Sequence, residues 1–290
     1  MASFRAHAST IIDPASEPTI TAQMYRDEAA LYAMVGKVTG SGLSGSGVLI
    51  SDRWVLTAGH VSLSKTNGSF TVGGNNYSIQ SYITHPNFSF SGPSYDLGLL
   101  YLSTPVTGLA AAAMIHFDAP TSILGREATW VGTGFTGTGL TGAQLPLEFR
   151  AFTNVIDVLG NHPDYGLPAT SFVADFDNPD GSTNAPDSSP TATRLEGNVA
   201  SGDSGGGVFV AVDGQPYLVG INSYLGGFAP GTNSKYGSLS GATNLDLFQD
   251  WIWAQTGIAA IPEPSALWLC ALGCLTGLRR RRRFPPPLRF

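Results

Sequence analysis

Residues 201–212 read Ser-Gly-Asp-Ser-Gly-Gly-Gly-Val-Phe-Val-Ala-Val, a glycine-rich turn that leads straight into an apolar strand. Glycines around a single serine let another backbone approach closely and let main-chain N–H groups converge. If Ser204 attacks a carbonyl group, the N–H groups of Gly202 and Ser204 are the natural donors to the developing negative oxygen. Taken alone, the stretch is also typical of a glycine-rich hairpin, so the rest of the chain has to decide between the two.

A serine hydroxyl is a poor nucleophile unless a base accepts its proton and a further group orients that base. His60 has the best setting of the five histidines, because the apolar run 54–57 ends in small residues that then present the imidazole. Asp96 is the carboxylate candidate, since it is a single acid at the head of the apolar run 97–102. A buried charge needs a partner, and the N–H of a histidine ring is a suitable one. A turn residue that opens a strand is the alternative for Asp96.

Three segments in the order His, Asp, Ser resemble the motifs of the trypsin/chymotrypsin-like serine proteases. They are GSGVLISDRWVLTAGH at 45–60, YDLGLLYL at 95–102 and SGDSGGGVF at 201–209. Subtilisins and α/β-hydrolases reach the same geometry through other chain orders. The resemblance covers about residues 30–255. It implies that His60 is general base and then general acid, that Asp96 orients the imidazole, and that Ser204 is the nucleophile.

Composition agrees with the fold that this resemblance implies. The chain has 290 residues with 36 Gly, 19 Pro and 12% charged residues, and so many turn formers between short apolar runs indicate an all-β protein. The resemblance implies two six-stranded antiparallel β-barrels with the catalytic groups in the cleft between them, and a closing helix near 246–253. We expect a protease domain over 30–257, with barrel 1 at about 30–105 and barrel 2 at about 127–245. Within the first barrel, residues 69–79 are typical of a hairpin.

The charge pattern argues against a nucleic-acid partner. The formal net charge is −6, and the arginines at 279–283 and 289 hide a more acidic body. An acidic surface repels phosphate, so we expect no binding of nucleic acid.

Cysteine usage offers the fold no disulfide outside the C-terminal tail. Cys270 and Cys274 are the two cysteines, and both lie in a terminal apolar segment. Relatives commonly carry disulfides beside the His and Ser motifs, whereas this chain has Val61 and Ala200 there. The fold must therefore depend on its core.

The resemblance also implies which residues contact the substrate. Asn198, six residues before Ser204, would form the floor of the primary specificity pocket. Ser223, Tyr224 and Leu225 would belong to the strand that pairs with the substrate backbone. Asn198 is neutral and cannot compensate a buried substrate cation. Leu225 replaces a glycine that admits large side chains, so we expect cleavage after small or medium uncharged residues and little activity on Lys or Arg.

Residues 1–29 are expected to form an N-terminal arm, because the first 20 are polar and prolines at 14 and 18 break any helix. Ala6-His7-Ala8-Ser9 resembles the end of a secretory signal peptide, so a truncated signal and a disordered arm both stay open. Many relatives become active when a new N-terminal Ile-Val-Gly-Gly inserts and pairs with the acid before the nucleophile, here Asp203. Residues 34–37 match that segment only faintly and are more typical of a barrel strand, which leaves the activation route open, including activity without cleavage.

Residues 258–290 resemble a PEP-CTERM sorting signal. Pro262-Glu263-Pro264 precedes thirteen uncharged residues, 266–278, and then five arginines. A helix of that length spans about 20 Å, which is short of a bilayer core of about 30 Å. The resemblance implies a transient membrane association, removal of the tail by a sorting enzyme, and a bacterial protein that is secreted or held in the envelope or its matrix. A plain tail anchor is the alternative, and residues 284–290 depart from the pattern, which usually stops at the arginines.

Signals for metals and cofactors are weak. His85, His116 and His162 have no Cys, His or acid nearby at ligand spacing, so we expect neither a metal nor a cofactor. Residues 175–181 alternate oxygen-bearing side chains before a glycine, but the missing glutamate favours an acidic surface turn over a Ca²⁺ site. The sequence thus predicts a serine endopeptidase that acts on proteins or peptides. A catalytically inactive binding or matrix protein on the same fold, and an esterase with the same triad, are the alternatives.

Overall fold

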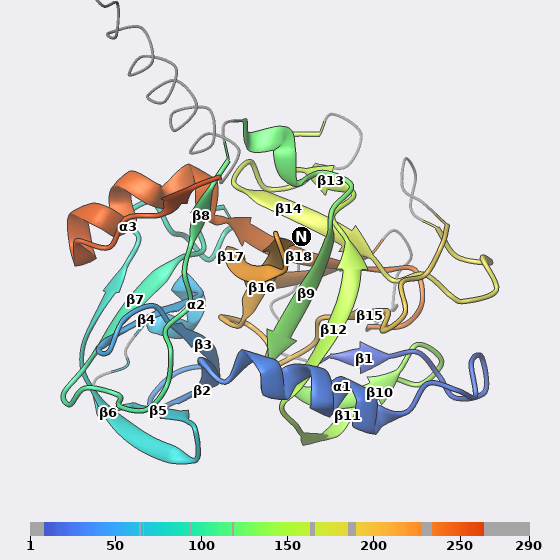
Figure 1. Cartoon of the computed structure of the whole chain (residues 1–290), viewed down its shortest axis with the longest axis horizontal. Coiled ribbons are helices and arrows are strands. Elements are labelled where there is room, and N and C mark those ends of the chain that lie inside the picture. The colour runs from blue at the N-terminus through green and yellow to red at the C-terminus, as the bar shows by residue number, and fades with distance from the viewer. Residues whose placement is uncertain are drawn as a thin grey trace, which may run out of the picture.

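The computed structural model describes residues 9–63, 65, 67–92, 94–117, 119–162, 166–184, 190–227 and 234–263. The signal-like residues 6–8, Pro264, the apolar run 266–278 with its two cysteines, and the arginine block lie outside the described residues. Strands dominate the described part, as predicted, and they form two β-domains that share a hydrophobic core cluster (Figure 1). No helix in these ranges is long and apolar enough to cross a membrane.

The first β-domain is a closed antiparallel barrel with the strand order β2-β3-β4-β7-β6-β5, as predicted. Its strands are β2 (Val35–Thr39), β3 (Gly45–Leu49), β4 (Trp54–Thr57), β5 (Ser69–Val72), β6 (Asn75–Thr84) and β7 (Gly98–Leu102). The predicted hairpin is present, since β5 and β6 meet at Gly73 and Gly74, whose positive φ suits a two-residue turn. Val48, Leu56 and Leu99 pair across neighbouring strands and are buried inside the barrel.

The second β-domain consists of two sheets. A seven-stranded sheet has the order β12-β9-β16-β17-β18-β14-β13, and a four-stranded sheet has the order β11-β10-β1-β15. The strands after the first barrel are β9 (Glu127–Gly132), β10 (Phe135–Thr138), β11 (Gly142–Leu147), β12 (Arg150–Val155), β13 (Val158–Leu159), β14 (Ser171–Asp175), β15 (Gly197–Asn198), β16 (Gly207–Val212), β17 (Gln215–Gly227) and β18 (Ser238–Asn244). The expectation was a second six-stranded barrel, whereas these strands form two sheets, and β1 (Thr10–Ile11) joins β10 to β15 within the smaller one.

Residues 9–29 pack into this second domain, although their polarity is typical of an arm. β1 is followed by α1 (Ala22–Ala29) and the short 3₁₀ helix η1 (Ala30–Tyr32), and α1 packs against β12. Ile11, Ile12 and Tyr25 are buried in the core of the second domain. The Tyr25 hydroxyl donates to the Glu196 carbonyl at 2.8 Å and accepts the Ile12 N–H at 3.2 Å. The segment is therefore a structural part of the domain that carries Ser204.

The segment between the β-domains and the C-terminal elements complete the fold. β8 (Ile115–His116) and the 3₁₀ helix η2 (Pro120–Ile123) lie in the crossover. The expected closing helix is present as η3 (Leu245–Phe248) followed by α3 (Gln249–Thr256), which ends at Gly257 with φ of 72°. β19 (Ile261–Pro262) then pairs in parallel with β8.

Candidate active site

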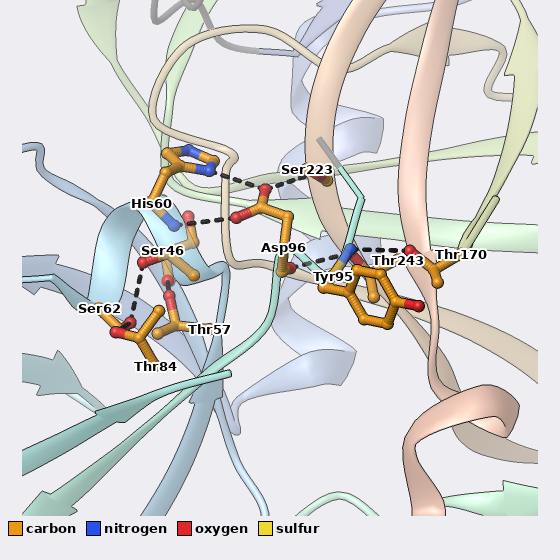
Figure 2. A network of polar contacts seen from close by, with 11 residues as sticks. Ser46, Thr57, His60, Ser62, Thr84, Tyr95, Asp96, Thr170, Ser223 and Thr243 are labelled. Atoms are coloured by element: carbon orange, nitrogen blue, oxygen red, sulfur yellow. Dashed lines mark hydrogen bonds and ion pairs between the residues drawn. The ribbon is translucent and has the colours of Figure 1, made fainter. Parts of the chain in front are cut away.

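His60 lies on α2 (Gly59–Ser62), a single turn that begins where β4 ends (Figure 2). Its ring Nδ1 is 2.8 Å from Asp96 Oδ2, and its main-chain N–H donates to Asp96 Oδ1 at 2.9 Å. One carboxylate therefore holds both the ring and the turn that carries it. Because a carboxylate accepts hydrogen bonds, the proton of the neutral imidazole lies on Nδ1 and the lone pair is left on Nε2.

Asp96 is fully buried at the junction of the two β-domains. Besides the two donors of His60, its Oδ2 accepts the Ser223 hydroxyl at 2.5 Å. Its main-chain carbonyl accepts the Thr243 hydroxyl at 2.9 Å. Figure 2 shows His60 and Ser223 reaching the carboxylate from opposite sides. Three hydrogen-bond donors therefore fix the orientation of the buried Asp96 carboxylate toward His60.

The residue before Asp96 has an unusual backbone. Tyr95 has φ of 57°, a left-handed conformation that is strained for an aromatic residue. Its N–H donates to Thr170 Oγ1 at 2.9 Å, and its ring stacks on His85 with centroids 5.2 Å apart. These contacts hold the turn that aims Asp96 at His60.

The loop that carries Ser204 is tied to the first barrel through Ser46 of β3. The Ser46 N–H donates to the Ser204 carbonyl at 2.7 Å, and the Ser46 hydroxyl donates to the Gly202 carbonyl at 2.6 Å. Gly205 has φ of 88°, and a Cβ atom placed on it would lie 2.2 Å from both Ser46 O and Thr57 Oγ1 and 3.1 Å from Ala58 N. Only glycine permits this approach. The loop therefore lies against the end of β4, beside the turn that carries His60.

Two amides of this loop have the character expected of oxyanion donors. The neighbouring amides already donate hydrogen bonds within the protein: Asp203 N–H donates to Ala200 O at 3.2 Å, and Gly205 N–H donates to Asn222 O at 2.8 Å. Among the described residues, no acceptor is present for the N–H groups of Gly202 and Ser204. Both residues are partly exposed. The arrangement leaves two main-chain donors beside a serine hydroxyl, which suits stabilisation of a negative oxygen.

The sequence of the chain is similar to those of known proteins. The family model described as Trypsin matches residues 24–161, which include His60 and Asp96. The chain is 26% identical over 243 residues to vitamin K-dependent protein C of Mus musculus, which covers 74% of this chain and 46% of that protein. It is 29% identical over 128 residues to a trypsin of Simulium vittatum, which covers 37% of this chain and 51% of that protein. The chain is therefore similar to trypsin-like serine proteases, and the family model covers the part that holds His60 and Asp96. It spans about half the length of the curated relatives it matches.

The residues expected at the substrate pocket differ from one another in burial and in hydrogen-bond partners. Asn198 is fully buried in the second β-domain, where its Nδ2 donates to Val199 O at 2.9 Å and its Oδ1 accepts the Ser240 hydroxyl at 2.7 Å. Tyr224 and Leu225 lie half-buried on β17, and the Tyr224 hydroxyl is 2.9 Å from Ser171 Oγ.

Ser223 lies at a register shift in β17 and points toward Asp96. The pairing of β17 with β18 shifts between Asn222 and Tyr224, so Ser223 has no partner in the register. Such a bulge redirects a side chain out of the regular alternation. The sequence assigned Ser223 to the substrate strand and contained no signal for its contact with Asp96.

Several other residues that hold the site were not predicted. Ser46 lies inside the recognised motif between two glycines, and a hydroxyl at that place could have been singled out. Thr170 and Thr243 carry no sequence signal, because their contacts with Tyr95 and Asp96 arise only when the two β-domains come together.

The other histidines in the described residues lie outside the candidate site. His85 packs against Tyr95, Phe248 and Trp251, and burial lowers its pKa. His116 Nδ1 is 2.7 Å from Asp246 Oδ1. His162 lies in the loop after β13. No group of three or more His, Cys, Asp or Glu side chains in the described ranges is arranged to hold a metal.

The acidic stretch 175–181 was expected on the surface, but its first two acids are buried. Asp175 ends β14, and Asp177 follows it in the interior beside Glu196. Burial and the charge of Asp175 raise the pKa of Asp177 to about 7, and burial together with the same neighbour raises the pKa of Asp157 to about 8. The pairing of β14 with β18 carries these side chains inward.

Proposed function

We propose that the chain is a serine endopeptidase in which Ser204 attacks the carbonyl carbon of a peptide bond. The observation that carries this proposal is the double contact of the buried Asp96 carboxylate with the ring Nδ1 and the main-chain N–H of His60. The two free amides beside Ser204 give further support, because the reaction needs donors at the point where negative charge develops.

The reaction follows from the roles of these groups. As the Ser204 Oγ–carbon bond forms, the hydroxyl proton moves to Nε2 of His60, and the carbonyl oxygen becomes an oxyanion that accepts the Gly202 and Ser204 N–H groups. The carbon–nitrogen bond then breaks, and His60 returns the proton to the leaving amine. Water, deprotonated by His60, attacks the acyl group and releases the acid and the Ser204 hydroxyl. Asp96 keeps the imidazole oriented and stabilises its protonated form throughout.

A fluorophosphonate probe tests the proposal, because it phosphonylates only a serine that is activated as a nucleophile. We expect labelling of the wild-type chain and none of Ser204→Ala. Circular dichroism of both chains checks that they fold. A folded wild-type chain that resists labelling would instead indicate an inactive binding or matrix protein, and hydrolysis of esters without hydrolysis of peptides would indicate an esterase.

We expect the enzyme to cleave after small or medium uncharged residues. The neutral Asn198 side chain, already hydrogen-bonded to Val199 and Ser240, supports this specificity, since a substrate cation would gain no ion pair there. The isobutyl group of Leu225 supports it by reducing the space for large side chains. Cleavage of a mixed peptide library measures the preference, and dominant cleavage after Lys or Arg would contradict it.

The C-terminal tail is proposed as a sorting signal that a membrane enzyme removes, which leaves a secreted or envelope-bound protease. The beginning of the motif is held on the domain, because Ile261 N–H donates to Met114 O at 2.8 Å and Glu263 Oε1 is 2.9 Å from Arg126 Nη2. These contacts support a boundary after Glu263 between the folded domain and the proposed signal. Intact-mass measurement of protein from the envelope tests the proposal, and an arginine block that is still attached would favour a permanent anchor.

A further inference from the structure

The strand β1 and the residue before it contact Asn198 and Asp203 of the candidate site and the neighbouring Ser234. Thr10 pairs with Asn198, the residue proposed for the pocket floor. The Thr10 hydroxyl donates to the Ser234 carbonyl at 2.5 Å. Ser9, directly before β1, contacts Asp203, the residue before the nucleophile. Figure 1 shows β1 in the second domain, beside β10 and β15.

Asp203 is a buried carboxylate that is held mainly by hydrogen bonds. It is 1% exposed, and its Oδ2 accepts the Ser9 hydroxyl at 2.6 Å and the Ala200 N–H at 3.1 Å. A Cβ atom placed on Gly132 would lie 2.1 Å from Asp203 Oδ1, so the other oxygen is packed directly on the β9 backbone. Burial raises the pKa of Asp203 to about 6, and the contact with Ser9 is the largest influence that lowers it.

The Asp203 backbone forms part of the loop that carries the two oxyanion donors. Its carbonyl accepts the Gly206 N–H at 2.8 Å, and its N–H donates to Ala200 at 3.2 Å. A shift of the carboxylate therefore moves the peptide groups on both sides of Asp203. The following peptide carries the Ser204 N–H, and the Gly202 N–H lies one peptide before the preceding one. A fixed Asp203 side chain keeps these donors in position before substrate arrives.

We infer that the hydroxyl of Ser9 is a positioning group for the nucleophile loop and that it acts from within an uninterrupted chain. The inference rests on the proposed function. It departs from the ammonium of a newly formed N-terminus that the family resemblance implies, since the Ser9 hydroxyl, and not a main-chain amine, contacts Asp203 Oδ2. Activity then depends on a hydroxyl at residue 9 and needs no cleavage before it.

The first arm of the test removes the hydroxyl. Ser9→Ala in the full chain is expected to lower kcat about 10- to 100-fold, the loss that corresponds to one hydrogen bond to a charged group, with KM little changed. Thr138→Val is the matched control, because the Thr138 hydroxyl binds Asp13 of the same N-terminal segment at 2.5 Å without touching Asp203. The control is expected to keep the wild-type kcat.

A double-mutant cycle separates positioning from a general loss of stability. If Ser9 acts through Asp203, Ser9→Ala adds less than a threefold loss of kcat in an Asp203→Asn background. A merely structural serine would lower the activity of both backgrounds by the same factor, and that result would overturn the inference.

The second arm compares the full chain with a chain that begins at Ser9, released from a cleavable fusion, and intact mass confirms both N-termini. Both are expected to be labelled by the fluorophosphonate probe at rates within a few fold. Labelling of only the shorter chain would show that an ammonium is required and would overturn the inference while leaving the protease proposal standing. If neither folded chain were labelled, the protease proposal itself would fail, and this inference with it.

Discussion

Removal of the Ser223 hydroxyl tests how the site holds Asp96. In Ser223→Ala, the fully buried carboxylate keeps only the two donors of His60 and loses the contact of 2.5 Å at Oδ2. A hydrogen bond to a charged group contributes about 1.5–3 kcal/mol, and little water can reach this position to replace it. We therefore expect the free energy of unfolding to fall by about 2 kcal/mol. For a chain of this size the corresponding decrease in Tm is roughly 4–8 °C.

The same change is expected to act on kcat rather than on KM. Ser223 and His60 Nδ1 share Asp96 Oδ2, so the loss of one donor frees the carboxylate to turn and lets the imidazole move away from the nucleophile. A reduction of kcat by about tenfold corresponds to about 1.4 kcal/mol of transition-state stabilisation. Calorimetry and steady-state kinetics on the full chain measure both quantities.

Thr153→Val is the control for this variant, since it removes a hydroxyl that is 2.8 Å from Thr193 Oγ1 and does not touch Asp96. It is expected to keep the wild-type kcat. An unchanged Tm together with an unchanged kcat in Ser223→Ala would refute the role of the hydroxyl in holding Asp96. A raised KM at constant kcat would return Ser223 to the substrate-binding role that its sequence position implies.

Three further variants test other parts of the site and the fold. Asp96→Asn is expected to lower kcat/KM by about 10⁴-fold with the fold intact, because an amide favours the wrong imidazole tautomer, and a loss below tenfold in the kinetic assay would contradict the role of Asp96. Gly205→Ala is expected to slow fluorophosphonate labelling by at least about 100-fold, since its Cβ would meet Ser46 O at 2.2 Å, whereas Gly214→Ala, with a similar φ of 77° but open space around it, is expected to keep the wild-type rate. Equal rates for the two glycine variants would refute the close approach. Burial raises the pKa of Asp157 to about 8 from 3.8, so the folded chain binds more protons than the unfolded chain and loses stability as the pH rises from about 4 to 8. Asp157→Asn is therefore expected to raise Tm by several degrees at pH 8 and to leave it unchanged at pH 4 in calorimetry, and equal shifts at both pH values would argue against a buried acid.

The residues of the candidate triad could be proposed from the sequence because each lies in a short local pattern, and the structure has the local elements that these patterns predict. His60 follows a short apolar strand, Asp96 precedes another, and Ser204 lies among glycines whose need is visible at Gly205. These signals depend on neighbours in the sequence. Much of the first barrel was predictable for the same reason, since β2 with β3, β3 with β4, and β5 with β6 pair as antiparallel neighbours in sequence.

The parts that sequence reasoning missed depend on contacts between distant segments. Ile11 and Ile12 lie in a polar stretch too short to show a strand period, and they become core only because β1 inserts between β10 and β15. Asp175 and Asp177 resemble a surface turn until the pairing of β14 with β18 carries them inside. Neither outcome can be inferred from local propensity, because tertiary pairing overrides it.

The described part of the chain holds its site with hydroxyl groups and has no cysteine beside the His and Ser motifs, where relatives commonly carry disulfides. Val61 stands at one of these places and packs on Gly45, where a Cβ atom would lie 2.8 Å from Val61 Cγ2 and 2.6 Å from the Ser204 carbonyl. In place of such a link, Ser46 joins the first barrel to the nucleophile loop, and Thr170 and Thr243 join the second domain to the turn around Asp96. Each of these contacts contributes only about 1 kcal/mol. They nevertheless join the two β-domains at the loop that carries Ser204 and at the turn around Asp96. Under the proposed mechanism, a small displacement of one β-domain against the other would therefore abolish activity before either domain unfolds.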